Sequence, residues 1–169
     1  MKKLSILTVG LLVFAFAGIV SSAAKGHGET MSQEHRSEVA DIVQKLTDIA
    51  GRDNNIGKEV REVAKEQSNV ASKSAEEIKE VEGRSGWKTF FIGTDWKNIG
   101  QLRSELVTTA NHIDRLIKAK ERATSQSVKD DLDAQIKALE EIKAKVEAFI
   151  KDNEGKFSLL GWLVRLFNR

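Results

Sequence analysis

The chain has 169 residues, enough for one domain, and it contains no proline, cysteine or tyrosine. The lack of cysteine excludes disulfides, thiolate metal sites and cysteine nucleophiles, and the lack of proline suits long uninterrupted helices. Basic residues number 27 and acidic residues 25, so the near balance of charge argues against a nucleic-acid partner.

The N-terminal segment has the order of a secretory signal peptide: basic, then apolar, then small. Residues 1–3 are basic at two positions, residues 4–20 are a run of 17 uncharged residues, and residues 21–24 are small. Cleavage is expected after Ala23 or Ala24. An uncleaved anchor is the alternative, because the apolar run is only slightly short for a membrane span. Both interpretations place the remaining chain outside the cytoplasm, in secreted or envelope-associated form.

Removal of residues 1–24 takes away two lysines and leaves 25 basic and 25 acidic residues. The three basic residues of segment 156–169 face no acid there, so the body is mildly acidic. Its densest basic cluster is interleaved with acids and is therefore expected to be a solvated helix face. The cluster consists of Arg115, Lys118, Lys120 and Arg122, with Asp114 and Glu121 between them.

Residues 25–31 are polar and are expected to form a flexible lead-in. Beyond them, apolar residues recur at steps of three and four, which predicts amphipathic helices. Four helices are expected, over residues 32–50, 55–82, 95–123 and 127–153. Gly51 is expected to cap the end of the first helix, Thr94 or Asp95 the start of the third, and Ser127 the start of the fourth.

These stripes predict an all-α fold: an elongated antiparallel helical bundle, or long helical hairpins with coiled-coil-like seams. Oligomeric coiled-coil rods are the alternative, because narrow seams also suit association between chains. Polar residues interrupt the seams at Gln67 and Ser74, and His112 borders the third stripe.

One aromatic-rich stretch separates the second and third predicted helices. It is expected to be an apolar plug at one end of the bundle, with an exposed tip that contacts a ligand or partner as the alternative. The aromatic residues of this stretch are Trp87, Phe90, Phe91 and Trp96.

The last segment, residues 156–169, predicts a short basic amphipathic helix. At 100° per residue its polar stripe is only about 100° wide, and every charge on it is positive. This pattern is typical of a helix that lies on a membrane surface, while docking on the bundle or on a partner chain is the alternative. The predicted contact residues are Phe157, Leu160, Trp162, Leu163, Arg165, Leu166, Phe167 and Arg169.

The helix count also predicts an arrangement. In an up-down bundle, residues near 30 and near 155 emerge at the same end. We expect the aromatic turn, residues 87–96, at the opposite end.

The sequence offers no catalytic, cofactor or metal constellation. No His has Glu three residues before it, and no Gly-rich phosphate loop or Gly-x-Ser-x-Gly motif occurs. The group His27, Glu29, Glu34 and His35 is expected to be a solvated N-terminal tail rather than a metal site, and His112 a half-buried structural histidine.

Three stretches carry a resemblance: residues 88–100 with 102–105, residues 34–40, and residues 155–163. Together they resemble an uncharacterised family of signal-peptide-bearing helical proteins from candidate-phyla (Patescibacteria-like) bacteria. The resemblance implies an exported, all-helical, non-enzymatic protein and brings no site residues.

We therefore expect an exported structural or interaction protein of the cell envelope, held peripherally at the membrane by its tail. Its partners would be the membrane surface and a second copy or another protein. One alternative is an extracytoplasmic holdase or adaptor. The other is a small-ligand-sensing bundle, for which Gln67, Ser74 and His112 would line the cavity.

Overall fold

The structure, a computed structural model, describes residues 30–84 and 93–154. These residues form four helices and no strand. The helices are α1 (Met31–Arg52), α2 (Gly57–Gly83), α4 (Trp96–Arg122) and α5 (Gln126–Glu154). The predicted all-α helical bundle is confirmed, and each end of a helix lies within two residues of its expected position.

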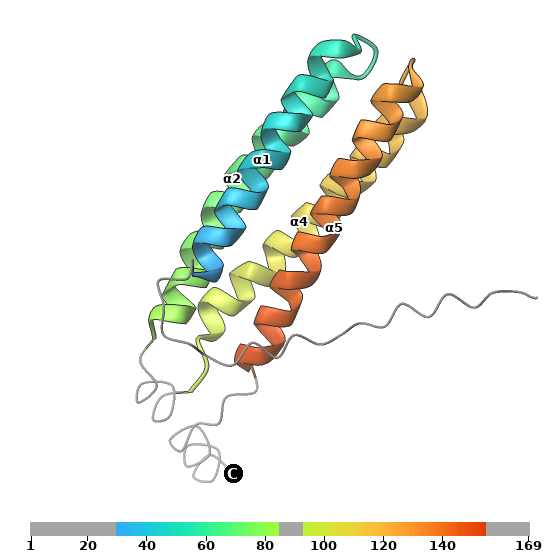
Figure 1. The fold of residues 1–169 in the computed structure, drawn as a ribbon. Coiled ribbons are helices and arrows are strands. Elements are labelled where there is room, and N and C mark those ends of the chain that lie inside the picture. The colour runs from blue at the N-terminus through green and yellow to red at the C-terminus, as the bar shows by residue number, and fades with distance from the viewer. Residues whose placement is uncertain (1–29, 85–92, 155–169) are drawn as a thin grey trace, which may run out of the picture.

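The helices alternate in direction and form two hairpins, α1–α2 and α4–α5, which lie side by side (Figure 1). α1 packs against α2 and α5, and α4 packs against the same two helices. Each helix therefore has two antiparallel neighbours within one chain, and the described helices are not isolated rods.

Both boundaries of the described chain lie at one end of the bundle, which we call the terminal end (Figure 1). The Thr94 hydroxyl donates to the carbonyl oxygens of Asn153, at 3.2 Å, and Glu154, at 3.3 Å. The Met31 amide donates to the Glu82 carboxylate at 3.0 Å. The expectation that residues near 30 and 155 emerge together is thus confirmed.

The expected place of the aromatic turn is wrong. Its described residues, 93–96, lie at the terminal end and not opposite it. The physical reason is simple: in an up-down bundle the second connection returns to the end at which the chain entered. Trp87, Phe90 and Phe91 lie outside the described residues, as do residues 1–29 and the tail.

Local capping explains where the helices begin and end. The Thr30 side chain accepts from the Gln33 amide, and Gln33 returns a bond to the Thr30 backbone, a capping box. Asp95 caps α4 as expected, by accepting from the Asn98 amide. Two expected caps are wrong, because α1 continues through Gly51 to Arg52, and Ser125 rather than Ser127 accepts from the Val128 amide.

The buried apolar side chains form two clusters along the bundle. The larger cluster fills the half that is closed by the turns at residues 53–56 and 123–125, which we call the turn end. The smaller one, built around Ile78, Leu102 and Val146, fills the terminal end. Among the described helices, none combines the length and hydrophobicity that a transmembrane span requires.

Asp53 joins the two turns at the turn end. One carboxylate oxygen accepts from the Asn55 amide at 2.9 Å. The other accepts from the Thr124 amide at 2.7 Å and the Thr124 hydroxyl at 2.9 Å. These hydrogen bonds, the Thr124 amide first, hold the pKa of Asp53 below its usual value.

The first prediction concerns the Asp53 clamp, by which we mean the hydrogen bonds that the Asp53 carboxylate accepts from Asn55 and Thr124. Asp53→Ala leaves the Thr124 amide without its acceptor, so the melting temperature should fall. The control is Asp48→Ala, at an exposed site on α1. Because the folded-state pKa of Asp53 is depressed, its contribution is present above the usual aspartate pKa and is lost as pH falls through the folded value. Equal melting curves for the two variants by circular dichroism at neutral pH would contradict the assignment.

Candidate functional site: a buried polar layer between two apolar clusters

A layer of buried polar side chains separates the two apolar clusters. Three of its members stand out in the sequence: Gln67 and Ser74 interrupt the apolar seam of the second helix, and His112 borders the third stripe. The buried polar residues of this layer are Ser32, His35, Gln67, Ser74, Thr109 and His112. Three helices contribute to it, so it is a tertiary feature rather than a property of one helix.

His112 on α4 is the centre of the first group in the layer. Its side chain is 3% exposed, and its Nδ1 lies 2.7 Å from Oε1 of Gln67 on α2. Its Nε2 lies 3.1 Å from Oε2 of Glu66. The Gln67 amide nitrogen in turn donates to the Thr109 hydroxyl at 3.5 Å. The expected half-buried structural histidine is thus fully buried.

Both protonation states of His112 can be satisfied within this group. The imidazolium donates from both nitrogens, to Gln67 and to Glu66. In the neutral ring only one nitrogen donates; if the Gln67 amide turns by half a rotation, its nitrogen donates to Nδ1 and its oxygen accepts from Thr109. Burial lowers the pKa of His112, while the Glu66 carboxylate opposes this shift.

Arg115 connects the His112 group to the surface. Its guanidinium lies 2.5 Å from Oε2 of Glu66 and 3.5 Å from Oε2 of Glu62. Glu66 therefore bridges a buried imidazole and a partly exposed guanidinium. The Glu66 side chain is half exposed, so the buried His112 contacts a carboxylate that reaches solvent.

The second group pairs two carboxyl groups. Ser74 on α2 donates to the carboxylate of Glu105 on α4. Burial raises the pKa of Glu105. Burial, together with the negative charge of Glu105, raises the pKa of Glu77 to about 7, and Lys73 and Lys97 oppose this shift. One Glu77 oxygen is buried and accepts no hydrogen bond from the described residues.

His35 on α1 corrects an expectation. The sequence predicts a solvated tail at this position, but His35 is 5% exposed, and its Nε2 makes no hydrogen bond to the described residues. Burial lowers its pKa, which the Glu38 carboxylate opposes. Glu34, from the same expected tail, instead binds Lys145 on α5 at 2.9 Å, and Glu38 binds it at 2.5 Å. His27 and Glu29 lie outside the described residues.

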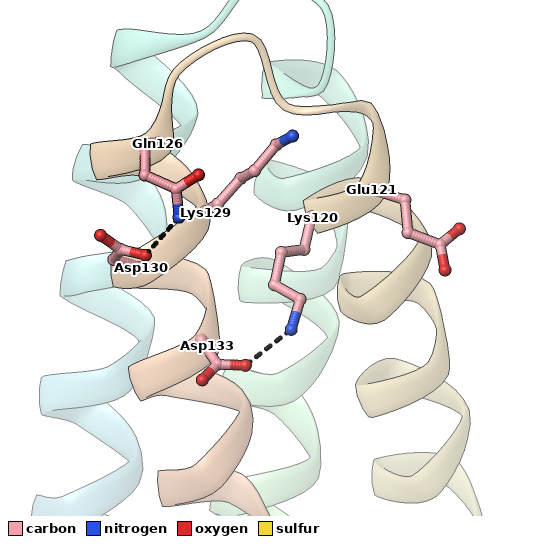
Figure 2. Close-up of a pocket in the computed structure, with 6 residues that line it drawn as sticks. All are labelled: Lys120, Glu121, Gln126, Lys129, Asp130 and Asp133. Carbon is pink, nitrogen blue, oxygen red and sulfur yellow. Dashed lines mark hydrogen bonds and ion pairs between the residues drawn. The ribbon is translucent and has the colours of Figure 1, made fainter.

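A second feature is an open polar groove of about 300 Å³ beside the α4–α5 turn. Lys120 binds Asp133 across it at 2.6 Å, and Gln126 donates to Asp130 at 2.7 Å (Figure 2). Lys120 belongs to the basic cluster, in which Arg115 pairs with Glu66 and Arg122 with Glu59. These ion pairs suit the expected solvated helix face.

The layer holds two histidines whose pKa is lowered by burial, His35 and His112, and it adjoins two carboxyl groups whose pKa is raised, Glu77 and Glu105. The described residues include no group of three or more His, Asp or Glu side chains placed to hold a metal ion.

Sequence reasoning missed Glu77, Glu105 and His35, because charged residues on a helix are ordinarily solvated. Glu77 directly precedes the seam residue Ile78, and this neighbouring position was the available signal.

No protein-family model, curated protein or solved structure matches the chain. The resemblance noted in the sequence remains a prediction.

The second prediction concerns Glu77. Its folded-state pKa, about 7, lies above the reference value of 4.5, so the folded protein binds the extra proton between these values. Stability should therefore fall as pH rises through this window. Glu77→Gln should remove this fall and make the protein more stable than wild type at about pH 8, with a smaller gain at about pH 5. Urea unfolding measures both, with exposed Glu80→Gln as control. A gain that does not depend on pH would contradict the assignment.

The third prediction concerns His112 and Gln67. His112→Leu removes the imidazole to which the buried Gln67 amide is hydrogen-bonded. The unsatisfied amide should destabilise the bundle by about 1–3 kcal/mol. Gln67→Leu combined with His112→Leu should cost less than the sum of the two single changes, because neither partner is then stranded. Denaturant unfolding of the four proteins gives the coupling, with exposed Asn111→Leu as control. Strict additivity would contradict the hydrogen bond.

Proposed function

We propose that this protein is an exported, non-enzymatic structural or interaction protein of the cell envelope. Its bundle associates peripherally with a membrane through the basic amphipathic segment 156–169. The first 24 residues direct export, with cleavage after Ala23 or Ala24.

The observation that carries this proposal is the convergence of chain connections at the terminal end. Residue 29 joins the bundle at Thr30, the aromatic stretch joins it at Arg84 and Gly93, and the tail joins it at Glu154. All of these junctions lie at the terminal end (Figure 1). The segments with the strongest membrane signals in the sequence therefore start from one end of the body.

Trp96 adds support from within the described residues. It is 62% exposed and lies at the start of α4, at the terminal end. An exposed indole next to a polar helix end is typical of a membrane interface. For this residue the expected exposed tip is favoured over the expected plug.

The two alternatives, a holdase and a ligand-sensing bundle, have different degrees of support. A holdase needs exposed apolar seams, and among the described residues only Trp96 and Val107 are large exposed apolar side chains. A ligand-sensing bundle gains from the burial of Gln67, Ser74 and His112 in one layer. However, Gln67 and His112 already bind each other, so a ligand would have to displace that bond.

The fourth prediction tests membrane association. Residues 25–169 should float with anionic vesicles of phosphatidylglycerol, and added salt should weaken this binding. Arg165→Glu with Arg169→Glu should reduce binding at least about tenfold, since each basic residue near an anionic surface contributes about 1 kcal/mol. Trp162→Ala should reduce binding to neutral vesicles as well.

The matched control for charge is Lys58→Glu with Lys129→Glu, two cations at the turn end. These substitutions should leave flotation almost unchanged, because they lie far from the terminal end. Equal loss in both double variants would show that binding follows net charge and not the tail. If residues 25–169 do not float with either vesicle, the membrane proposal fails.

A further inference from the structure

Two exposed apolar side chains lie on the same face of α4. Trp96 is 62% and Val107 is 63% exposed. They are eleven residues apart, which is three turns, so they differ by only about 20° around the helix. Gly100 and Arg103 lie between them within about 40° of Trp96. We call these four residues the outer stripe of α4.

The middle of the outer stripe is open. A Cβ atom built on Gly100 would meet no atom within 4 Å, so nothing in the described bundle covers this position. Glycine there lets another chain approach the α4 backbone closely. The stripe therefore has an apolar group at each end and a shallow, accessible centre.

The end of α5 is attached to this stripe. Arg103, a member of the stripe, pairs with the carboxylate of Glu154. Thr94, two residues before Trp96, donates to the carbonyl oxygens of Asn153 and Glu154. Residue 155 therefore starts its path beside the outer stripe and not on a remote face.

Length and apolar pattern match between the stripe and the segment that follows Glu154. Trp96 to Val107 extends about 16 Å along α4 at 1.5 Å per residue. The helix that the sequence predicts over residues 157–167 would be about as long. Its apolar arc is broad enough to cover a neighbouring helix face, and it carries Leu160 and Leu163.

The charges on α4 and on the tail agree with a tail that runs along α4 from Glu154. One further heptad along the stripe face stands Asp114, which is exposed and makes no ion pair with the described residues. A tail that runs up α4 from Glu154 carries its last cation, Arg169, toward this carboxylate, to about the level of Val107 and about 9 Å short of Asp114 along the helix at 1.5 Å per residue. A cation near an exposed anion adds a modest attraction.

We propose that the outer stripe of α4 is the docking surface for residues 157–169 of the same chain. The docked tail covers Trp96, Gly100 and Val107 and hides its own apolar face from water. A membrane then competes with α4 for one apolar face. The contact itself forms without lipid, so it does not depend on the proposed membrane association.

The absence of cysteine from the sequence permits a direct test by disulfide formation. The test uses residues 25–169, which include every described residue, with Gly100→Cys and Leu163→Cys in one chain under mild oxidant. Two controls keep the tail cysteine and move its partner to other open helical glycines: Gly83→Cys, also at the terminal end, and Gly51→Cys, at the turn end. Circular dichroism verifies that each variant folds.

Docking predicts that the 100–163 disulfide forms within the monomer at least about tenfold faster than the 83–163 disulfide, with little 51–163 product. Val107→Glu should slow the 100–163 reaction, whereas Asn69→Glu, on an exposed face of α2, should not. Equal rates at Gly100 and Gly83 would overturn the proposal. So would a covalent dimer formed by Gly100→Cys alone at the rate expected of docking, since a second copy would then occupy the stripe.

The lipid measurement is read separately. If the 100–163 disulfide forms rapidly and the chain does not float, the tail docks on α4 and the membrane proposal fails. If the chain floats and the disulfide shows no preference for Gly100, the membrane is the tail's partner and the docking proposal fails. Rapid disulfide formation that vesicles suppress supports both.

Discussion

The bond between His112 and Gln67 sets how α4 lies against α2. Apolar stripes of similar period can slide by one turn and still bury much of their surface, whereas a buried imidazole and a buried amide have few alternative partners. A slip of one turn would separate these two groups and leave a buried hydrogen-bonding group unsatisfied, which is costly. The Ser74–Glu105 contact follows the same alignment further along the two helices.

The histidines and the carboxyl groups in and beside this layer affect stability in opposite directions as pH changes. His35 and His112 have folded-state pKa values below the reference value of 6.5. The folded state is therefore not penalised by these histidines above pH 6.5, and its stability declines as pH falls below that value. Glu77 and Glu105 have raised values, so their burial becomes less favourable as pH rises from 4.5. The stability of the bundle is therefore lowered at acidic pH by the two histidines and at alkaline pH by the two carboxyl groups.

Helices and seams could be predicted from the sequence because each is a local property of spacing. The polar interruptions at Gln67 and Ser74 could also be found, since they break an apolar period, and His112 could be found because it borders one. The burial of His35 and the partial burial of Glu77 could not, because they depend on which neighbouring helix covers these residues. The end of the bundle at which Trp96 lies was predicted wrongly, although helix count alone decides it. The outer stripe of α4 was missed, because Val107 lies off the seam.

The convergence of all long connections at one end has a mechanical consequence. A load applied through the N-terminal or C-terminal segment enters the bundle at the same end and crosses none of its length. The opposite end, closed by the Asp53 clamp, then projects as an extension of the attached end. Since α5 has 29 residues, this extension is about 43 Å long. A surface that holds the terminal end would carry the groove between Lys120 and Asp133 at that height, as a spacer does.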